Sequence, residues 1–327
     1  MDLGEIVKTI RSYPGVTRKN VIRDVVKYLP LDGFPNVAAS LGEDAAAIEF
    51  KDGYLLFAAD GIMESLLNSD PFYAGYFAIL VNVSDIAAMG GKPLGMVDVM
   101  SVKDHKVCCQ VMRGMGRAVK KFNVPVVGGH THPDCKYQAI DVSIVGFVPK
   151  GDIIRSNTAR VGDDVVFAMD LDGFFPSHLP YAYDTTSRKE DSVVQEQIGL
   201  MARVAAERIV TAAKDMSNPG CLGTLGMLLE SSDKGAVVDI DAIPRPEGVD
   251  LIQWLLAYMG YGFVLTCDPS NTGRLIELFE GVGVACAKVG RVEGGNTLRI
   301  RNATGEAVLF DFGSDIITGC GPYKKKA

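Results

Sequence analysis

Apolar positions recur along the chain with two different spacings, and the spacing changes many times over its 327 residues. Short apolar runs such as Tyr-Leu-Leu-Phe-Ala-Ala over 54–59 indicate strands, whereas three- and four-residue spacing over 72–89 is typical of a helix. The pattern predicts helices over 2–12, 17–28, 72–89, 104–122, 190–213 and 271–281, and another that opens in the glycine-rich segment 217–226. It predicts strands over 45–50, 54–59, 94–102, 124–128, 137–148, 164–169, 236–240 and 262–267, and short strands near the end. Because strands and helices mix in both halves, we expect an α/β (α+β) fold.

The length of the chain predicts two domains. At 327 residues it is too long for one average core, so two domains of about 150 residues each are expected. The segment 155–164, Arg-Ser-Asn-Thr-Ala-Arg-Val-Gly-Asp-Asp, is polar and rich in turn formers. We therefore place the boundary near residue 158, which gives domains 1–158 and 159–327.

Charge and composition narrow the classes of partner. The net charge of −7 argues against a general nucleic-acid binder, whose surface is basic. The start of the chain lacks the basic-then-apolar pattern of a signal peptide, and the run FAILVNVSDIAAMG is interrupted by Asn82, Ser84 and Asp85. We therefore expect a cytoplasmic protein that binds neither nucleic acid nor membranes. Seven scattered cysteines without a Cys-x-x-Cys pair fit that compartment.

Acidic residues stand in unusually apolar surroundings. Asp44 comes just before an apolar strand, Asp60 ends the next strand, and Asp85 lies inside an apolar helix. Asp215 and Asn218 stand at the start of the glycine-rich segment. An acid is costly to bury unless a cation pairs with it, and converging acids are usually reconciled by Mg²⁺ with a phosphate ligand. The alternative is that each aspartate caps a helix or closes a turn.

Five segments in order resemble the superfamily that contains aminoimidazole ribonucleotide synthase, thiamine-monophosphate kinase, selenophosphate synthetase and the hydrogenase maturation protein that makes the cyanide ligand. The segments are GEDAAAI at 42–48, NVSDIAAMGGKP at 82–93, GGHT at 128–131, ARVGD at 159–163 and DMSN at 215–218. The combination of GEDAAAI, GGHTHP and DMSNPGCLGTLGMLLE looks most like the synthase-related proteins of the methanogenesis marker protein 2 group.

The resemblance implies a two-domain fold in which the N-terminal sheets of two subunits close a β-barrel, so that a homodimer binds ATP in the resulting groove. It implies Mg²⁺ ligands at Asp44, Asp60 and Asp85, with Glu43 and Asp215 as further ones. Lys92 either neutralises charge in the transition state or is a solvated loop lysine. The resemblance also implies ATP-binding positions, which are Gly42, Asn82, Gly128, Gly129, His130 and Thr131.

The sequence departs from the superfamily pattern at several positions. His130 replaces the acid that most relatives have after Gly-Gly, and Asn218 replaces the last Asp of the Asp-x-Ser-Asp loop. In the predicted loop GGHTHPD, His130 and His132 alternate, so they either share one side of an extended segment as ligands for a metal or phosphate, or are ordinary loop histidines. The N-terminal cysteine of selenophosphate synthetases is missing, and the last cysteine, Cys320, lies seven residues before the end.

The function expected from these features is ATP- and Mg²⁺-dependent phosphoryl transfer to an oxygen of a small substrate. The replacements at His130 and Asn218 keep open an alternative from another class, a catalytically impaired ATP-binding regulator or maturation partner protein.

Overall fold

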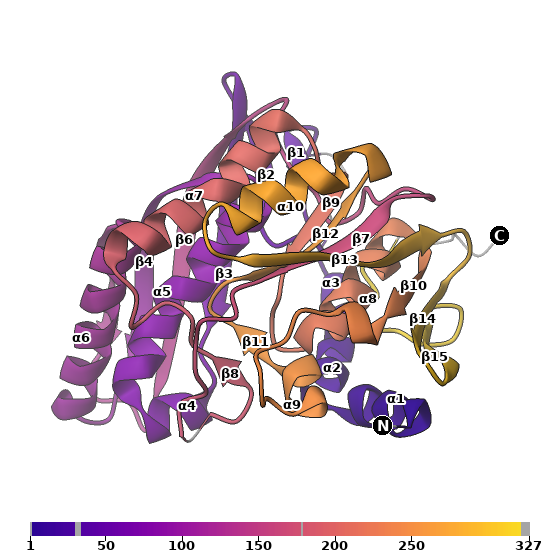
Figure 1. Cartoon of the computed structure of the whole chain (residues 1–327). Coiled ribbons are helices and arrows are strands. Elements are labelled where there is room, and N and C mark those ends of the chain that lie inside the picture. Colours follow the sequence, from indigo (N-terminus) through magenta and orange to yellow (C-terminus); the bar gives the residue numbers. More distant parts are fainter. Residues whose placement is uncertain (1, 30–33, 178, 322–327) are drawn as a thin grey trace.

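The computed structural model describes residues 2–29, 34–177 and 179–321, which form two mixed sheets with helices packed against them (Figure 1). The first sheet has the strand order β1-β2-β3-β6-β4-β5, and all neighbours are antiparallel except β4 and β5. Its strands are β1 (Val37–Ala39), β2 (Ala46–Phe50), β3 (Gly53–Gly61), β4 (Lys92–Ser101), β5 (Val126–His132) and β6 (Ala139–Pro149). This is the N-terminal half of a two-domain α/β fold.

Helix α5 (Pro71–Ala88) covers one face of the first sheet, together with α4 (Glu64–Ser69) and α6 (His105–Phe122). It begins where Asp70 accepts a hydrogen bond from the Tyr73 amide at 3.0 Å, with Pro71 in the first turn. By length and composition α5 would be long enough to cross a membrane. However, 78% of its residues are buried, and the helix lies between the first sheet, α6 and the second half of the molecule. It is therefore a core helix.

The second sheet has the strand order β15-β14-β10-β13-β7-β12-β9. Its strands are β7 (Asp164–Met169), β9 (Ala212–Asp215), β10 (Gly235–Asp239), β12 (Gly262–Cys267), β13 (Ala285–Glu293), β14 (Thr297–Asn302) and β15 (Gly305–Asp311). β8 (Ala182–Tyr183) and β11 (Tyr258–Met259) form a separate parallel pair. Every residue of β7 and β12 is buried, because helices cover both faces of this sheet, and these central strands are accordingly largely apolar.

The helices that cover the two faces of the second sheet come from distant parts of the sequence. On one face pack α7 (Asp191–Glu207) and α10 (Thr272–Glu280). On the other pack α1 (Leu3–Ser12), α8 (Gly220–Ser232) and α9 (Leu251–Leu256). Helix α1 therefore belongs spatially with the second sheet, where it contacts β14 and β15 (Figure 1). The domain boundary near residue 158 stays a prediction.

The apolar core runs without a break from the first sheet into the second. It includes side chains of α5 and α6, of α7 and α10, and of one face of β7 and β12. Helix α5 contacts both α7 and β9. The two halves therefore share buried surface, and a cavity lies where they meet.

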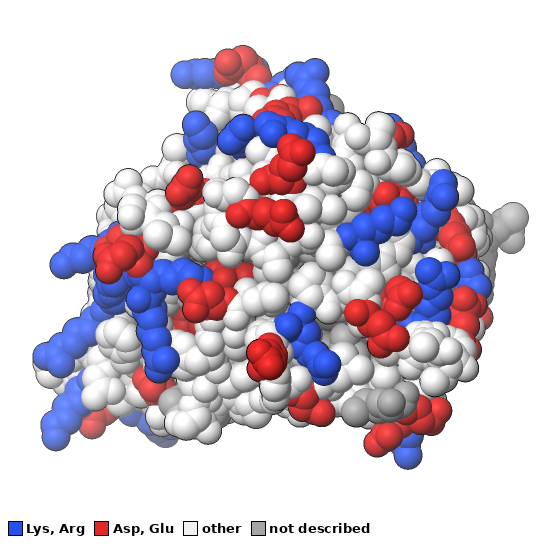
Figure 2. All heavy atoms as spheres, viewed as in Figure 1, with Lys and Arg blue, Asp and Glu red and all other residues white. Residues whose placement is uncertain are grey.

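Charged side chains of both signs are interspersed over the face seen in Figure 2. Lys and Arg gather at the left of this view, over α6, which carries Lys106, Arg113, Arg117 and Lys120. The expectation that the protein does not bind nucleic acid stays a prediction.

Most predicted helices and strands are confirmed, but the helix predicted over 190–213 is wrong at its end. Helix α7 stops at Glu207, Arg208 adopts φ 54°, and Ala212–Asp215 forms β9 beside β12. The alanines of this segment favour a helix, and pairing with β12 overrides that preference.

The helix predicted over 17–28 is also wrong, because the structure has three short pieces there. They are α2 (Pro14–Thr17), the 3₁₀ turn η1 (Arg18–Val21) and α3 (Ile22–Val26). Val26 is the single buried side chain of η1 and α3, so these residues lack the apolar stripe that would hold a longer helix. Further 3₁₀ turns are η2 (Ile240–Ala242) and η3 (Pro269–Asn271).

Residues 128–132, predicted as a loop, continue β5. They pair in parallel with β4. The rings of His130 and His132 lie 4.5 Å apart between centroids, as expected for alternate positions on one side of an extended segment.

Candidate functional site

A cavity of about 380 Å³ lies between the two halves of the molecule. Its walls come from the segment before β2, the end of β3, one side of α5, and the end of β9. The start of the chain contributes Lys19 and Ile22, and the last described segment contributes Thr318 and Cys320. Segments that are far apart in the sequence thus meet at one site.

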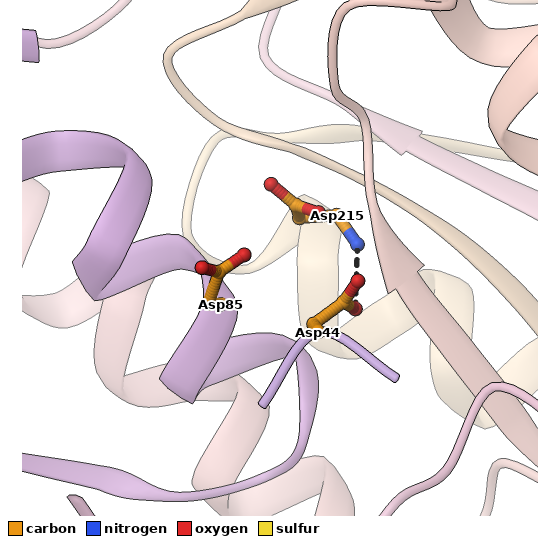
Figure 3. Close-up of side chains that lie close together, drawn as sticks. All are labelled: Asp44, Asp85 and Asp215. Carbon is orange, nitrogen blue, oxygen red and sulfur yellow. Dashed lines mark hydrogen bonds between the residues drawn. The ribbon is translucent and has the colours of Figure 1, made fainter. Parts of the chain in front are cut away.

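Three aspartates converge in this cavity. Asp44, Asp85 and Asp215 each offer a carboxylate oxygen, and these three oxygens lie within 4.8 Å of one another. Figure 3 shows Asp85 on a helix, facing the other two across the site. Asp44 Oδ2 accepts a hydrogen bond from the Asp215 amide at 3.3 Å, marked by the dashed line. Three carboxylate oxygens at this separation suit a hard divalent cation such as Mg²⁺, which prefers oxygen ligands.

Lys214 lies directly against this acidic cluster. Its ammonium contacts Asp44 Oδ1 and donates to the Gly42 carbonyl at 3.3 Å. Burial opposes the ammonium form of Lys214, but Asp44, Asp215 and Glu43 outweigh burial and raise its pKa. Lys214 is therefore a permanent positive charge inside the site. The sequence pattern missed it, because a lysine near the end of a predicted helix is ordinarily solvated.

The carboxyl groups of the site hold protons unusually well. Burial, and then the charge of Asp44, raise the pKa of Asp215 to about 8. Burial raises the pKa of Asp85 well above its usual range, and Asp60 and Asp215 add to the effect. Asp60 lines the same cavity and hydrogen-bonds Asp85, and burial raises its pKa too. Fully ionised, these four acids would outnumber the two lysines of the cavity, Lys214 and Lys19, so a bound cation would favour release of their protons.

Glu43 and Gly42 shape the loop that carries Asp44. Glu43 Oε2 accepts hydrogen bonds from the Ser156 amide at 2.6 Å and the Ser156 hydroxyl at 2.8 Å. Gly42 has φ 97°, and a Cβ at this position would lie 2.8 Å from Cβ of Cys320. The glycine is needed for its conformation and for space. Glu43 thus anchors the loop as well as lining the cavity.

The remaining predicted site residues lie elsewhere. Asn82 is fully buried and donates to the Ala78 carbonyl at 2.8 Å, while its Oδ1 has no partner among the described residues. Lys92 is exposed at the start of β4. Gly128, Gly129, His130 and Thr131 are exposed along β5, the edge of the first sheet. None of these residues lines the cavity that holds the aspartates.

Comparisons with known proteins agree with this architecture. Residues 42–148 match the family model "AIR synthase related protein, N-terminal domain", and residues 170–301 match "AIR synthase related protein, C-terminal domain". "Uncharacterized protein MJ0640" of Methanocaldococcus jannaschii is 43% identical over 98% of this chain and 100% of its own length. A selenide, water dikinase of Carboxydothermus hydrogenoformans is 27% identical over 69% of this chain and 68% of its own.

Solved structures with the same fold include PurL of Thermotoga maritima. Its complex with FGAR has a TM-score of 0.79 at 15% identity, over 99% of this chain and 54% of that one. Its complex with ATP has a TM-score of 0.74 at 16% identity, over 93% of this chain and 51% of that one. The present chain thus spans about half the length of PurL. The resemblance to the superfamily is confirmed, whereas the subgroup stays a prediction. The chain belongs to the AIR synthase related protein family.

Proposed function

We propose that this protein binds ATP with Mg²⁺ and transfers a phosphoryl group to an oxygen of a small substrate. The observation that carries the proposal is the convergence of Asp44, Asp85 and Asp215 within 4.8 Å of one another, beside the buried ammonium of Lys214. Clustered carboxylates plus a fixed positive charge are the parts that phosphoryl transfer requires.

The donor set fits Mg²⁺. Asp44, Asp85 and Asp215 would hold the metal, and bound Mg²⁺ would neutralise phosphate charge. The chain's own contribution is to hold these acids in place from three segments. Lys214 orients Asp44 and remains charged, so it is suited to contact a phosphate oxygen. The cavity between the two halves removes the reacting groups from bulk water.

Two of the similar proteins support a role for ATP. PurL of Thermotoga maritima is described in a complex with ATP, and the relative from Carboxydothermus hydrogenoformans is named a selenide, water dikinase. The first cysteine of the present chain is Cys108, so a nucleophilic cysteine in the N-terminal segment is not available for selenide chemistry. The acceptor is therefore expected to differ from selenide.

Binding of ATP tests the metal site. Isothermal titration calorimetry with Mg²⁺ should give an ATP affinity that falls at least about tenfold in Asp85→Asn, because a charged ligand is lost from the site. Asp52→Asn, in the exposed turn between β2 and β3, is the control and should bind like wild type. An Asp85→Asn protein that keeps full Mg²⁺-dependent affinity would contradict the assignment.

A turnover assay distinguishes a phosphotransferase from the alternative, an ATP-binding regulator or maturation partner. Purified protein, ATP and Mg²⁺ are incubated with fractions of a cell extract, and mass spectrometry is used to detect a phosphorylated product. A product that is absent with Asp85→Asn supports phosphoryl transfer. Tight ATP binding without turnover in any fraction supports an ATP-binding regulator or maturation partner, the reading that the replacements at His130 and Asn218 favour.

We also propose that the protein is a homodimer joined through the first sheet. The face of this sheet opposite α5 exposes Phe57, Val97 and Val99, each between 43% and 48% accessible. His130 pairs with Val99 across β4 and β5 and so lies on the same face. An exposed apolar face of this kind marks an interaction surface, and a second copy is the partner that the superfamily resemblance implies. Such pairing would bring β5, with Gly128 to Thr131, into a groove suited to the nucleotide.

A further inference from the structure

The cavity that holds the aspartates has a second, apolar end. Along α5 the cavity is lined by Phe77, Leu80 and Val81, and then by Ser84 and Asp85. These positions follow three- and four-residue spacing and form one stripe on the helix. At 1.5 Å per residue, the stripe runs about 12 Å from Phe77 to Asp85. The surface of the cavity thus changes from apolar to acidic over the length of a small molecule.

Other elements complete the apolar end. Met63 and Leu66 line it from α4 and the residue before it, and Tyr183 and Tyr258 line it from β8 and β11. The backbone directly after β11 lies close to α5, because a Cβ placed on Gly260 would be 3.4 Å from Leu80 Cδ1. The tyrosines and the α5 stripe therefore bound one space.

This end offers few hydrogen-bonding groups. Among its described lining residues, the polar side-chain groups are the tyrosine hydroxyls and the amide of Asn218, which lies 4.0 Å from Met63 Sδ, and Tyr183 already donates to the Leu171 carbonyl at 2.8 Å. The amides of Tyr258 and Gly260 donate to the carbonyls of Tyr181 and Tyr183, each at 2.9 Å. A purine base placed here would leave its ring nitrogens and amino group largely unpaired, which is unfavourable. A compact apolar group has no hydrogen-bonding atoms to leave unpaired here.

We propose that the acceptor is an amphipathic small molecule whose phosphorylated oxygen lies at Asp44, Asp85 and Asp215, and whose aromatic or branched apolar group lies against Phe77, Leu80 and Tyr258. The two parts are separated by no more than about 12 Å along α5. This inference rests on the proposed phosphoryl transfer at the acidic end. It assigns the apolar end to the acceptor and places the adenine of ATP elsewhere.

The test uses 1-naphthyl phosphate as a mimic of the phosphorylated product and 1-naphthol as a mimic of the acceptor. With Mg²⁺, wild-type protein should bind 1-naphthyl phosphate at least about tenfold more tightly than inorganic phosphate, because the ring system buries apolar surface. ATP should not displace 1-naphthol, as followed by naphthol fluorescence. Equal affinity for 1-naphthyl phosphate and inorganic phosphate, or displacement of naphthol by ATP, overturns the inference.

Substitutions in the chain test where the apolar group of the ligand binds. Val81→Trp fills the apolar end at a half-buried position and should lower the affinity for 1-naphthyl phosphate at least about tenfold while leaving that for Mg²⁺–ATP unchanged. Val193→Trp, at a 39% exposed position on α7, is the matched control because it lies outside both the cavity and the exposed face of the first sheet. Unchanged naphthyl phosphate binding in Val81→Trp also overturns the inference. A wild-type protein that binds 1-naphthol but does not bind Mg²⁺–ATP would instead refute the proposed function alone.

Discussion

At the scale of single residues, the site combines groups that the sequence pattern predicts with groups that it misses. Asp44, Asp60, Asp85 and Asp215 were expected from their apolar surroundings, and all four line one cavity. Lys214 was missed because its strand was predicted as the end of a helix. Lys19 and Cys320 come from the two ends of the chain, and no local pattern brings distant ends together. A cation beside converging acids becomes visible only once the fold has placed them.

Lys214 balances charge inside the cluster, so its removal should destabilise the protein. Lys214→Met leaves the carboxylate of Asp44, 5% exposed, without its cation and should lower the free energy of unfolding by about 3 kcal/mol. Lys214→Arg, which keeps the charge, should lose less. Thermal unfolding with and without Mg²⁺ measures both, and Mg²⁺ should raise the Tm of Lys214→Met more than that of wild type. A Lys214→Met protein as stable as wild type would show that the ion pair contributes nothing to folding.

At the scale of elements, the fold was predictable wherever apolar spacing is regular and a stop signal follows. The helix predicted over 72–89 corresponds to α5, which is followed by Gly90 at φ 74°. Two failures occur where pairing with another strand decides the structure, in β9 and in residues 128–132 of β5. The helix predicted over 17–28 fails because its residues lack an apolar stripe. The parallel pair of β8 and β11 was also missed, because each strand has only two residues and its partner is distant in the sequence.

Helix α8 ends at a residue in the left-handed region, which allows a test of its cap. Asp233 has φ 53°, is exposed, and donates its amide to the Glu230 carbonyl at 3.3 Å. Glycine adopts this conformation at less cost, so Asp233→Gly should raise the free energy of unfolding by about 0.5 kcal/mol. Asp233→Ala keeps the unfavourable φ and should not stabilise. Denaturant titrations compare the three proteins, and a stabilised alanine variant would mean that some other property of Asp233 matters.

At the scale of the whole molecule, the exposed apolar face of the first sheet is the feature that calls for a partner. Phe57 stands on it in β3, and Val97 and Val99 stand on it in β4, with β6 between these two strands. The opposite face is covered by α5, so these residues contribute nothing to the core of a single chain. Burial in a second copy gives them a physical role.

A charge on this face should separate the proposed dimer. Val99→Glu places a carboxylate on the exposed face of the first sheet and should weaken self-association at least about tenfold, measured by sedimentation equilibrium. Val193→Glu, at a 39% exposed position on α7, provides the control because it lies outside this face. A wild-type protein that sediments as a monomer at all concentrations would refute the dimer.

The packing of α1 against β14 and β15 constrains how the protein is made. The guanidinium of Arg11 pairs with Asp315 at 2.7 Å, across 304 positions of sequence. During synthesis the first helix leaves the ribosome long before the strands that will cover Leu3, Ile6 and Ile10 exist. Its apolar stripe therefore stays exposed, or is held by a chaperone, until β14 and β15 have been made. Closure of so long a loop makes the docking of α1 a late step of folding.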